Sequence, residues 1–422
     1  MRQRTDSLFN NIDWLIVGMY LLLVLMGWLN IYAAVYNEEH QNILDMSQKY
    51  GKQLLWISSS LLIAAIILII DEEFYTVFPY IIYGIFILAN IAVPFLGREV
   101  KGSRSWFRFG DFGVQPAEFM KFATNLALAK FLSNSKIKIA DYKNTFISLA
   151  IIGIPLLIIK KLQDETGLAI VFAAFIFAMY REGLSVNYLL LSFLAAILFI
   201  LALMVNNIYL FIVIGSLCLL SLLFIRRTRK NLFAVAIIGI IACSMIKGTS
   251  TVYENMENHQ KVRIDVLLGR GTVDLKKEGY NVNQAKIAIG SGGFLGKGYL
   301  EGTQTKYDFV PEQDTDFIFC TVGEQWGFVG STFVILLLAS LIVRVIFLAE
   351  RQRSAFSRIY GYGVASIIFF HLAINVGMTI GLAPVIGIPL PFFSYGGSSL
   401  WSFTILLFIF IKLDSHRLQI FR

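Results

Sequence analysis

The sequence predicts an all-α polytopic integral membrane protein with about twelve transmembrane helices and one large extracytoplasmic loop. Three observations lead to this fold class. Hydrophobic residues make up 57% of the 422 residues and charged residues only 15%, against roughly 25% charged in an average soluble domain. The apolar residues lie in runs that approach or exceed the roughly 17–25 residues that a spanning helix needs. Lysines and arginines gather in alternate connections between these runs.

The predicted spans cover twelve apolar runs, at residues 13–36, 52–70, 74–95, 116–133, 144–160, 166–180, 184–205, 207–225, 231–247, 316–349, 359–383 and 396–412. The run 166–180 is short for a spanning helix. It forms either a tight helical hairpin or a re-entrant pair with the run before it. No repeat with a period of roughly 20–50 residues is present, so we expect residues 1–422 to form a single membrane domain.

The charge distribution predicts the orientation. With the N-terminus inside, both termini and most of the lysines and arginines in short connections lie in the cytoplasm, as the positive-inside rule expects. The loop 96–117 and the large loop 248–315 then lie outside, and their positive charges need a reason other than topology. Residues 1–12 precede an apolar run that is too long for a signal-peptide core, which predicts a retained first helix.

The cysteine and histidine content excludes several kinds of site. The chain has 3 cysteines and 4 histidines. An odd number of cysteines, all inside apolar runs, excludes a disulfide framework, and the scattered histidines match no metal-binding pattern. The glycine-rich stretch near Lys297 is not a Walker A loop, because Ser291 and Gly298 stand where that motif requires Gly and Ser or Thr. We expect no nucleic acid partner.

The outer loop 96–117 contains the first candidate site. Lys101, Arg104 and Arg108 cluster there beside Trp106. Tryptophan and arginine commonly anchor helices at headgroup level, so an interfacial belt is one interpretation. The other is an anion site, because guanidinium groups bind phosphate oxygens in pairs, and this density of cations exceeds what anchoring requires.

The span that follows this loop opens at Pro116, and proline favours the first turn of a helix. Glu118 and Lys121 are three residues apart, so they share one face near the outer end of this helix. We treat both as candidates for binding the substrate.

A segment at the end of the large loop, 284–319, is rich in glycine in its first half and contains Lys297 and Thr303. Glycines let backbone amides and Lys297 approach an anionic headgroup. A flexible hairpin is the alternative interpretation of the same residues.

The segment 375–401 combines three prolines with several glycines and interrupts the helical pattern between two spans. Irregular backbone at membrane depth is tolerated where protein or a water-filled cavity surrounds it. Ser394 and Ser398 would present hydroxyl groups there. A kinked turn with a purely structural role is the alternative.

The stretch PEQDTDFIF, 311–319, places Glu312, Asp314 and Asp316 at the mouth of an apolar run, where acids are costly. Asp314 or Thr315 could cap a helix that begins near Asp316. We expect Asp316 in the first turn of that helix. A carboxylate at this position is a candidate general base, aided by desolvation or by a metal cation that acidifies the incoming hydroxyl.

Taken together, these segments resemble the SEDS family (shape, elongation, division, sporulation). The matching pieces are KGSRSW, QPAEFMK, AIGSGGFLGKG, EGTQ, PEQDTDFIF, NVGMTIGLAPVIGIPLPF and SYGGSS. They occur in the family's order over most of the chain, and jointly they are highly specific.

The resemblance implies a peptidoglycan glycosyltransferase of the bacterial inner membrane that polymerises lipid II at its outer face, for cell-wall elongation and rod shape. An inverting displacement of undecaprenyl pyrophosphate needs one base, and the family's essential acid falls on Asp316. Lys101, Arg104, Arg108, Lys121 and Lys297 would bind the pyrophosphate. Further substrate contacts are expected at Glu118, Thr303, Glu312, Gln313, Ser394 and Ser398.

The family also implies a divalent cation, Mg²⁺ or Mn²⁺, which Asp316 and Glu312 would hold together with substrate phosphates. Its implied partners are a class B penicillin-binding protein acting as transpeptidase and other membrane proteins of the elongation machinery.

The sequence departs from the family pattern at several positions. Ala117 replaces a serine, LQDETG at 162–167 lacks a proline, and Asp314 is an additional acid. The family usually has ten spans, so we expect an extra helix pair within 184–247. A lipid II flippase or transporter and a non-catalytic cell-wall scaffold remain alternative functions. A transporter would place ionisable residues along a path near the bilayer midplane, where Arg344 is the clearest candidate.

Overall fold

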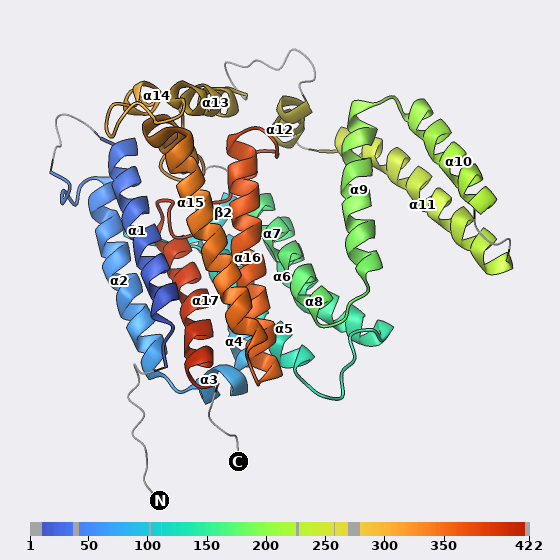
Figure 1. The fold of residues 1–422 in the computed structure, drawn as a ribbon, viewed down its shortest axis with the longest axis horizontal. Helices are drawn as coiled ribbons and strands as arrows, with labels where there is room; N and C mark the ends of the chain where they lie inside the picture. The colour runs from blue at the N-terminus through green and yellow to red at the C-terminus, as the bar shows by residue number, and fades with distance from the viewer. Residues whose placement is uncertain are drawn as a thin grey trace, which may run out of the picture. The chain divides into compact units, whose positions relative to one another are not determined.

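The computed structural model describes residues 11–36, 42–100, 103–110, 112–224, 228–256, 258–268 and 279–417. The chain divides into two compact units, one formed by Met1–Leu184 with Tyr280–Arg422 and the other by Ser185–Gly279. Both units are mainly helical (Figure 1).

The larger unit is a helical bundle. Its elements are α1 (Trp14–Ala34), α2 (Lys49–Ile69), α3 (Glu72–Val77), α4 (Pro79–Leu96), α5 (Pro116–Leu132), α6 (Tyr142–Leu162), α7 (Thr166–Val171), η1 (Phe172–Ala174), α8 (Phe175–Arg181), α13 (Tyr280–Gly292), α14 (Thr303–Lys306), α15 (Ile318–Glu350), α16 (Ala355–Thr379) and α17 (Gly397–Ser415). Helices α5 and α17 are buried along almost their whole length and pack against each other. They form the centre of the bundle, where α2 packs against α17, α4 and α6 pack against α5, and α16 packs against both.

The twelve predicted spans all fall on helices, but they do not all qualify as spans by length. Ten of the described helices are long and apolar enough to cross a membrane. The helix predicted at 116–133 has 17 residues, and the short run 166–180 is divided into α7, η1 and α8. The predicted polytopic helical fold is therefore confirmed, whereas the count of twelve spans stays a prediction.

The loop 96–117, predicted to lie outside, contains strands, which the all-α prediction did not include. Strands β1 (Arg98–Val100), β2 (Ser103–Phe109) and β3 (Phe112–Val114) form an antiparallel sheet in that order. The aromatic residues Trp106, Phe107 and Phe109 favour a strand at this position. The sheet continues into α5 through Gln115, so it fixes where that helix begins.

The smaller unit contains α9 (Val186–Met204), α10 (Asn207–Phe224), α11 (Arg229–Glu254) and α12 (Asn258–Leu268). Helices α9 and α11 pack against each other, and so do α10 and α11. The predicted large loop 248–315 is largely helical, because α11 extends into it and α12, α13 and α14 follow.

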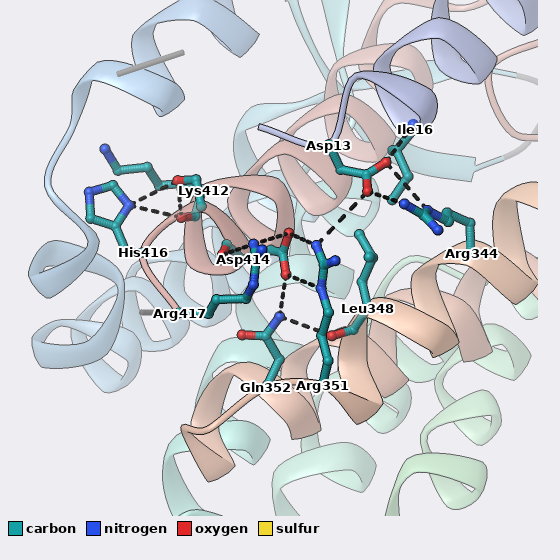
Figure 2. Close-up of polar contacts among 11 residues, drawn as sticks. Asp13, Ile16, Arg344, Leu348, Arg351, Gln352, Lys412, Asp414, His416 and Arg417 are labelled. Atoms are coloured by element: carbon teal, nitrogen blue, oxygen red, sulfur yellow. Dashed lines mark hydrogen bonds and ion pairs between the residues drawn. The ribbon is translucent and has the colours of Figure 1, made fainter. Parts of the chain in front are cut away.

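At the end where α1 begins and α17 ends, called the terminal end below, a polar cluster joins three helices (Figure 2). The guanidinium of Arg351 forms two bonds to Asp414, at 2.6 and 3.2 Å, and Gln352 donates to the same carboxylate at 2.6 Å. Arg344 bonds Asp13 at 2.6 Å. Arg344, the candidate for a transport path, is thus paired with the carboxylate that caps α1.

Because of Asp13, the stability of the protein should depend on pH in the acid range. Burial raises the pKa of Asp13, but hydrogen bonds from Arg344 and the Ile16 amide, with the charges of Arg344 and Arg351, outweigh it and hold the pKa below its usual value. A carboxylate whose pKa is lowered in the folded state stabilises the protein above about pH 4. This stabilisation is lost as the pH falls through the lowered pKa. Asp13→Asn should therefore lower stability by about 1 kcal/mol at neutral pH and by less below about pH 4.

Thermal unfolding of the protein in detergent across this pH range measures the effect. Asp141→Asn is the matched control, because Asp141 also precedes a helix but makes no side-chain cap. Equal stability losses for the two variants at neutral pH would contradict the prediction.

Candidate active site

Helix α15 is broken at Gly327, and a glycine-rich segment fills the break. Gly327 has a φ of +61° and a ψ of −156°, so the helical backbone bonds cannot continue through it. On one side of the break, the amides of Phe328 and Val329 donate to the carbonyls of Gly293 and Phe294, at 2.9 and 3.2 Å. The break therefore finds hydrogen-bond partners in a different part of the chain.

On the other side of the break, carbonyls of α15 accept hydrogen bonds from the glycine-rich segment. The amides of Lys297 and Gly298 donate to the carbonyls of Glu324 and Gln325, at 3.0 and 3.1 Å. We call the paired segments 292–298 and 323–329 the glycine seam. It joins the end of α13 to the N-terminal part of α15.

The glycines of the seam are required by close backbone approach. A Cβ atom on Gly292 would lie 2.0 Å from the carbonyl oxygen of Gly323, and one on Gly296 would lie 2.1 Å from that of Gln325. Gly296 also has a φ of +85°, which side chains other than glycine disfavour. The prediction that these amides cradle an anionic headgroup is wrong for Lys297 and Gly298, because both donate into α15, and the segment is not a flexible hairpin.

Glu324 holds the chain that follows the seam. Its carboxylate is fully buried and accepts from Lys297 Nζ at 2.7 Å, and from the amides of Gln304 and Thr305 at 2.8 and 2.9 Å. Lys297 Nζ also donates to Thr303 Oγ1 at 2.7 Å. The structure thus brings together two predicted substrate residues, Lys297 and Thr303, around a carboxylate that the sequence analysis did not select. Its position eight residues after Asp316, on the stripe through Cys320, was the available signal.

The acidic stretch 311–317 lies before α15 and not within it. The helix begins at Ile318, with Phe317 as its N-cap and no side-chain cap bond. The predictions that Asp316 lies in the first turn and that Asp314 or Thr315 caps the helix are therefore wrong. The reason is a long-range partner, because Asp314 pairs with Lys49 of α2 at 2.8 Å.

Asp316 is partly exposed and faces the irregular segment between α16 and α17. A Cβ atom on Gly387 would lie 3.3 Å from its Oδ2, so this glycine leaves room at the carboxylate. Its backbone carbonyl accepts from Asn375 Nδ2 at 2.8 Å. The neighbouring carbonyl of Thr315 accepts from Ser394 Oγ at 2.7 Å.

Glu312 and Gln313 lie in the same stretch but differ in burial. Glu312 is partly exposed and accepts from Thr315 Oγ1 at 2.9 Å. Gln313 is buried, and its amide nitrogen lies within hydrogen-bond distance of the Ala34 and Thr305 carbonyls, both at 2.8 Å. Gln313 therefore ties the acidic stretch to the end of α1 and to α14.

The two predicted serine contacts also bond the protein backbone. Ser394 Oγ accepts from the amide of Leu390 at 2.9 Å. Ser398 Oγ accepts from the amide of Gln115 at 3.1 Å and donates to the carbonyl of Gly113 at 3.2 Å. Ser394 thus connects the irregular segment to the acidic stretch, and Ser398 connects the start of α17 to the sheet. Their contact with a substrate stays a prediction.

Glu118 and Lys121 form an ion pair on one face of α5, as their spacing predicts, with Lys121 Nζ 2.7 Å from Glu118 Oε2. Both are buried, with side-chain exposures of 4% and 1%. Lys121 Nζ also lies 3.3 Å from Nε2 of His371 on α16, and over the ring of Phe403. His371 is a second residue that the sequence analysis did not select.

The cations of the sheet are more accessible. Arg104 and Arg108 are exposed residues of β2, and their spacing places them on one face of the strand. Arg104 lies 3.4 Å from Glu99. Lys101 lies outside the described residues.

The residues predicted to hold a metal do not form a complete cage. Among the described residues, no group of three or more His, Cys, Asp or Glu side chains could hold a metal ion. Asp316 and Glu312 could supply two carboxylates, so a cation there would need its other ligands from substrate oxygens or water.

The comparisons with known proteins show the family of the chain. The cell cycle protein family of FtsW, RodA and SpoVE matches residues 13–214 and 186–419 in two overlapping segments. The overlap lies within the region predicted to contain an extra helix pair. The chain is 30% identical to the peptidoglycan glycosyltransferase RodA of Treponema pallidum, covering 97% of this chain and 99% of that protein. It is also 30% identical to the peptidoglycan glycosyltransferase MrdB of Escherichia coli K12, covering 94% and 93%.

Solved structures show the same fold. One chain belongs to a study of how a peptidoglycan synthase complex coordinates polymerization and crosslinking. It matches with a TM-score of 0.71 at 22% identity, covering 97% of this chain and all of that chain. The crystal structure of RodA from Thermus thermophilus matches with a TM-score of 0.62 at 23% identity, covering 97% and 99%.

The buried Glu324 cluster yields a stability prediction. Glu324→Gln should lower the free energy of unfolding by about 3 kcal/mol. The substitution leaves the Lys297 ammonium beside a neutral group, and it places the glutamine NH₂, which donates, against backbone amides that also donate. Thermal unfolding in detergent measures the loss. Glu301→Gln is the matched control, since Glu301 is an exposed glutamate of the same segment. A midpoint for Glu324→Gln equal to that of the control would contradict the role of the cluster.

Proposed function

Because the chain belongs to the cell cycle protein family of FtsW, RodA and SpoVE, we propose that it is a peptidoglycan glycosyltransferase that polymerises lipid II for cell-wall elongation. The observation that carries the mechanism is the placement of Asp316. Its side chain is partly exposed and lies beside Gly387 of the irregular segment. The backbone around it is held by the side chains of Asn375 and Ser394, which donate to the carbonyls of Asp316 and Thr315.

In the proposed reaction, the 4-hydroxyl of an N-acetylglucosamine attacks C1 of the donor N-acetylmuramic acid. A bond forms between the acceptor oxygen and C1, and the bond from C1 to the phosphate oxygen breaks. Undecaprenyl pyrophosphate leaves with the electron pair, and Asp316 takes the hydroxyl proton. An α-linked donor that gives a β-linked product is inverted once, so one positioned base is sufficient.

The leaving pyrophosphate is proposed to bind at the sheet. Arg104 and Arg108 are exposed guanidiniums on one face of β2, and Lys101 belongs to the same proposed group. Lys121 and Lys297 each already bind a buried carboxylate. If either lysine moved to bind phosphate, its partner carboxylate would be left buried and uncompensated, which is costly. The sheet residues are therefore proposed as the primary phosphate contacts.

We also propose a divalent cation, Mg²⁺ or Mn²⁺, at Asp316 and Glu312. Bound there with pyrophosphate oxygens, it would acidify the acceptor hydroxyl and offset charge on the leaving group. The residues of the chain supply the base, the seating of the acidic stretch and the contacts to phosphate.

The proposed setting is the inner membrane, with both termini in the cytoplasm and the acidic stretch at the outer face. A class B penicillin-binding protein is the proposed partner. Support comes from the similarity of the fold to a chain in a study of coupled polymerization and crosslinking. Other membrane proteins of the elongation machinery are proposed on family membership alone.

Asp316→Asn should reduce polymerisation by about 10²-fold or more, since it removes the base without changing the size of the side chain. The assay uses the purified protein with its transpeptidase partner, lipid II and Mg²⁺, and follows glycan chains on a gel. Asp314→Asn is the matched control from the same stretch and should retain activity within about tenfold, because Asp314 bonds Lys49. Equal polymerisation by wild type and Asp316→Asn would exclude the base. Movement of lipid II across vesicles without polymer from wild type would favour a transporter.

Removal of divalent cations with a chelator should abolish polymerisation, and Mg²⁺ or Mn²⁺ should restore it. Glu312→Gln should raise the cation concentration needed for half-maximal rate, because one of two carboxylate ligands is lost. Glu301→Gln, outside the acidic stretch, should leave that concentration unchanged. Full activity in the presence of the chelator would contradict the metal proposal.

A further inference from the structure

We propose that His371 is a positioning residue for glycosyl transfer, which connects the buried Glu118–Lys121 pair to the segment that seats Asp316. The inference rests on the proposed role of Asp316 as the base. The residues that carry it lie on α5, α16 and the irregular segment before α17.

The contacts of His371 fix its protonation state. Nδ1 lies 3.0 Å from the carbonyl oxygen of Pro389, which can only accept, so Nδ1 carries a hydrogen. Nε2 lies 3.3 Å from Lys121 Nζ, which can only donate as an ammonium group, so Nε2 accepts. The imidazole is therefore neutral, and it bridges a cation on α5 and a carbonyl on the irregular segment.

The environment of the bridge is closed. His371 is fully buried, with its ring edge-on to Phe403 at a centroid distance of 4.8 Å. Lys121 is neutralised by Glu118 on its other side. A side chain that cannot hydrogen-bond at position 371 would leave both Lys121 and the Pro389 carbonyl one contact short, in a place that water does not reach.

The next turn of α16 extends the same attachment to Asp316. Asn375 lies four residues after His371, so both project from one face of the helix. Asn375 Nδ2 donates to the carbonyl of Ile388 at 2.7 Å and to that of Asp316 at 2.8 Å. The successive carbonyls of Ile388 and Pro389 in the irregular segment thus accept hydrogen bonds from Asn375 and His371, which lie on successive turns of α16.

This attachment sets the surroundings of the Asp316 carboxylate. Its Oδ2 lies beside Gly387, the residue just before the two anchored carbonyls. The irregular segment contains no helix from 382 to 396, only a turn at 391–393, so its position depends largely on such contacts. Loss of the His371 bridge should shift this segment against Asp316 and misplace the base while the outer phosphate contacts stay in place.

The test compares His371→Leu with His371→Gln in the reconstituted polymerisation assay. Glutamine can donate to the Pro389 carbonyl and accept from Lys121, whereas leucine can do neither. His371→Leu should lower kcat by roughly 30- to 100-fold with KM for lipid II within about threefold. His371→Gln should recover kcat to within about fivefold of wild type. Ser366→Ala is the matched control, because this buried α16 hydroxyl donates within its own helix, to Tyr362, and its activity should be unchanged.

A double variant separates the bridge from the base. If His371 acts through Asp316, His371→Leu should add little further loss to Asp316→Asn. Wild-type activity in His371→Leu with loss in Asp316→Asn would overturn the bridge alone. Full activity in Asp316→Asn would overturn the proposed base and the bridge to it. Equal loss in the leucine and glutamine variants, or a change confined to KM, would also overturn the proposal.

A measurement on the wild-type protein keeps the test independent of how the variants fold. Nitrogen NMR of ¹⁵N-histidine-labelled protein, with His371→Gln used to assign the signal, should show a neutral ring protonated at Nδ1. A cationic ring or one protonated at Nε2 would overturn the bridge.

Discussion

The break in α15 at Gly327 is the constraint on which the candidate site depends. A helix that stops inside a membrane bundle must find other partners for the amides and carbonyls that it releases. The segment 293–298 supplies those partners on both sides of the break. Because the partners are backbone groups, only glycine fits where the two segments touch. The seam thereby holds α13 against α15. Glu324 then fixes α14 from within α15.

Three buried acids of the larger unit each have a lysine beside them that compensates their charge. Glu118, Asp314 and Glu324 each lie within 2.8 Å of a lysine nitrogen. These pairs join α2, α5 and the seam to their neighbours, and each would be costly to break. Asp316 differs because it is only partly buried and faces a segment without regular structure. The chain thus separates carboxylates that hold the fold from the carboxylate assigned to chemistry.

Much of the fold could be predicted from the sequence, because long apolar runs report directly on spanning helices. The orientation that the positive-inside pattern predicts stays a prediction. The ordered motifs predicted the family. The errors arose where a distant partner decides the structure. Asp314 was assigned to a cap because Lys49, far away in sequence, could not be seen as its partner. The glycines near Lys297 were assigned to a headgroup because nothing in the sequence indicates that α15 breaks. His371 was passed over as one of several scattered histidines.

The claim that the glycine seam holds the N-terminal part of α15 can be tested most directly by hydrogen exchange on the wild-type protein in nanodiscs. We predict that the amides of Lys297, Gly298, Phe328 and Val329 exchange at least about 10²-fold more slowly than those of the exposed connection 134–138. Glu324→Gln should raise exchange at Gln304 and Thr305, which donate to that carboxylate. Exchange of the four seam amides as fast as that of the exposed connection would contradict the account.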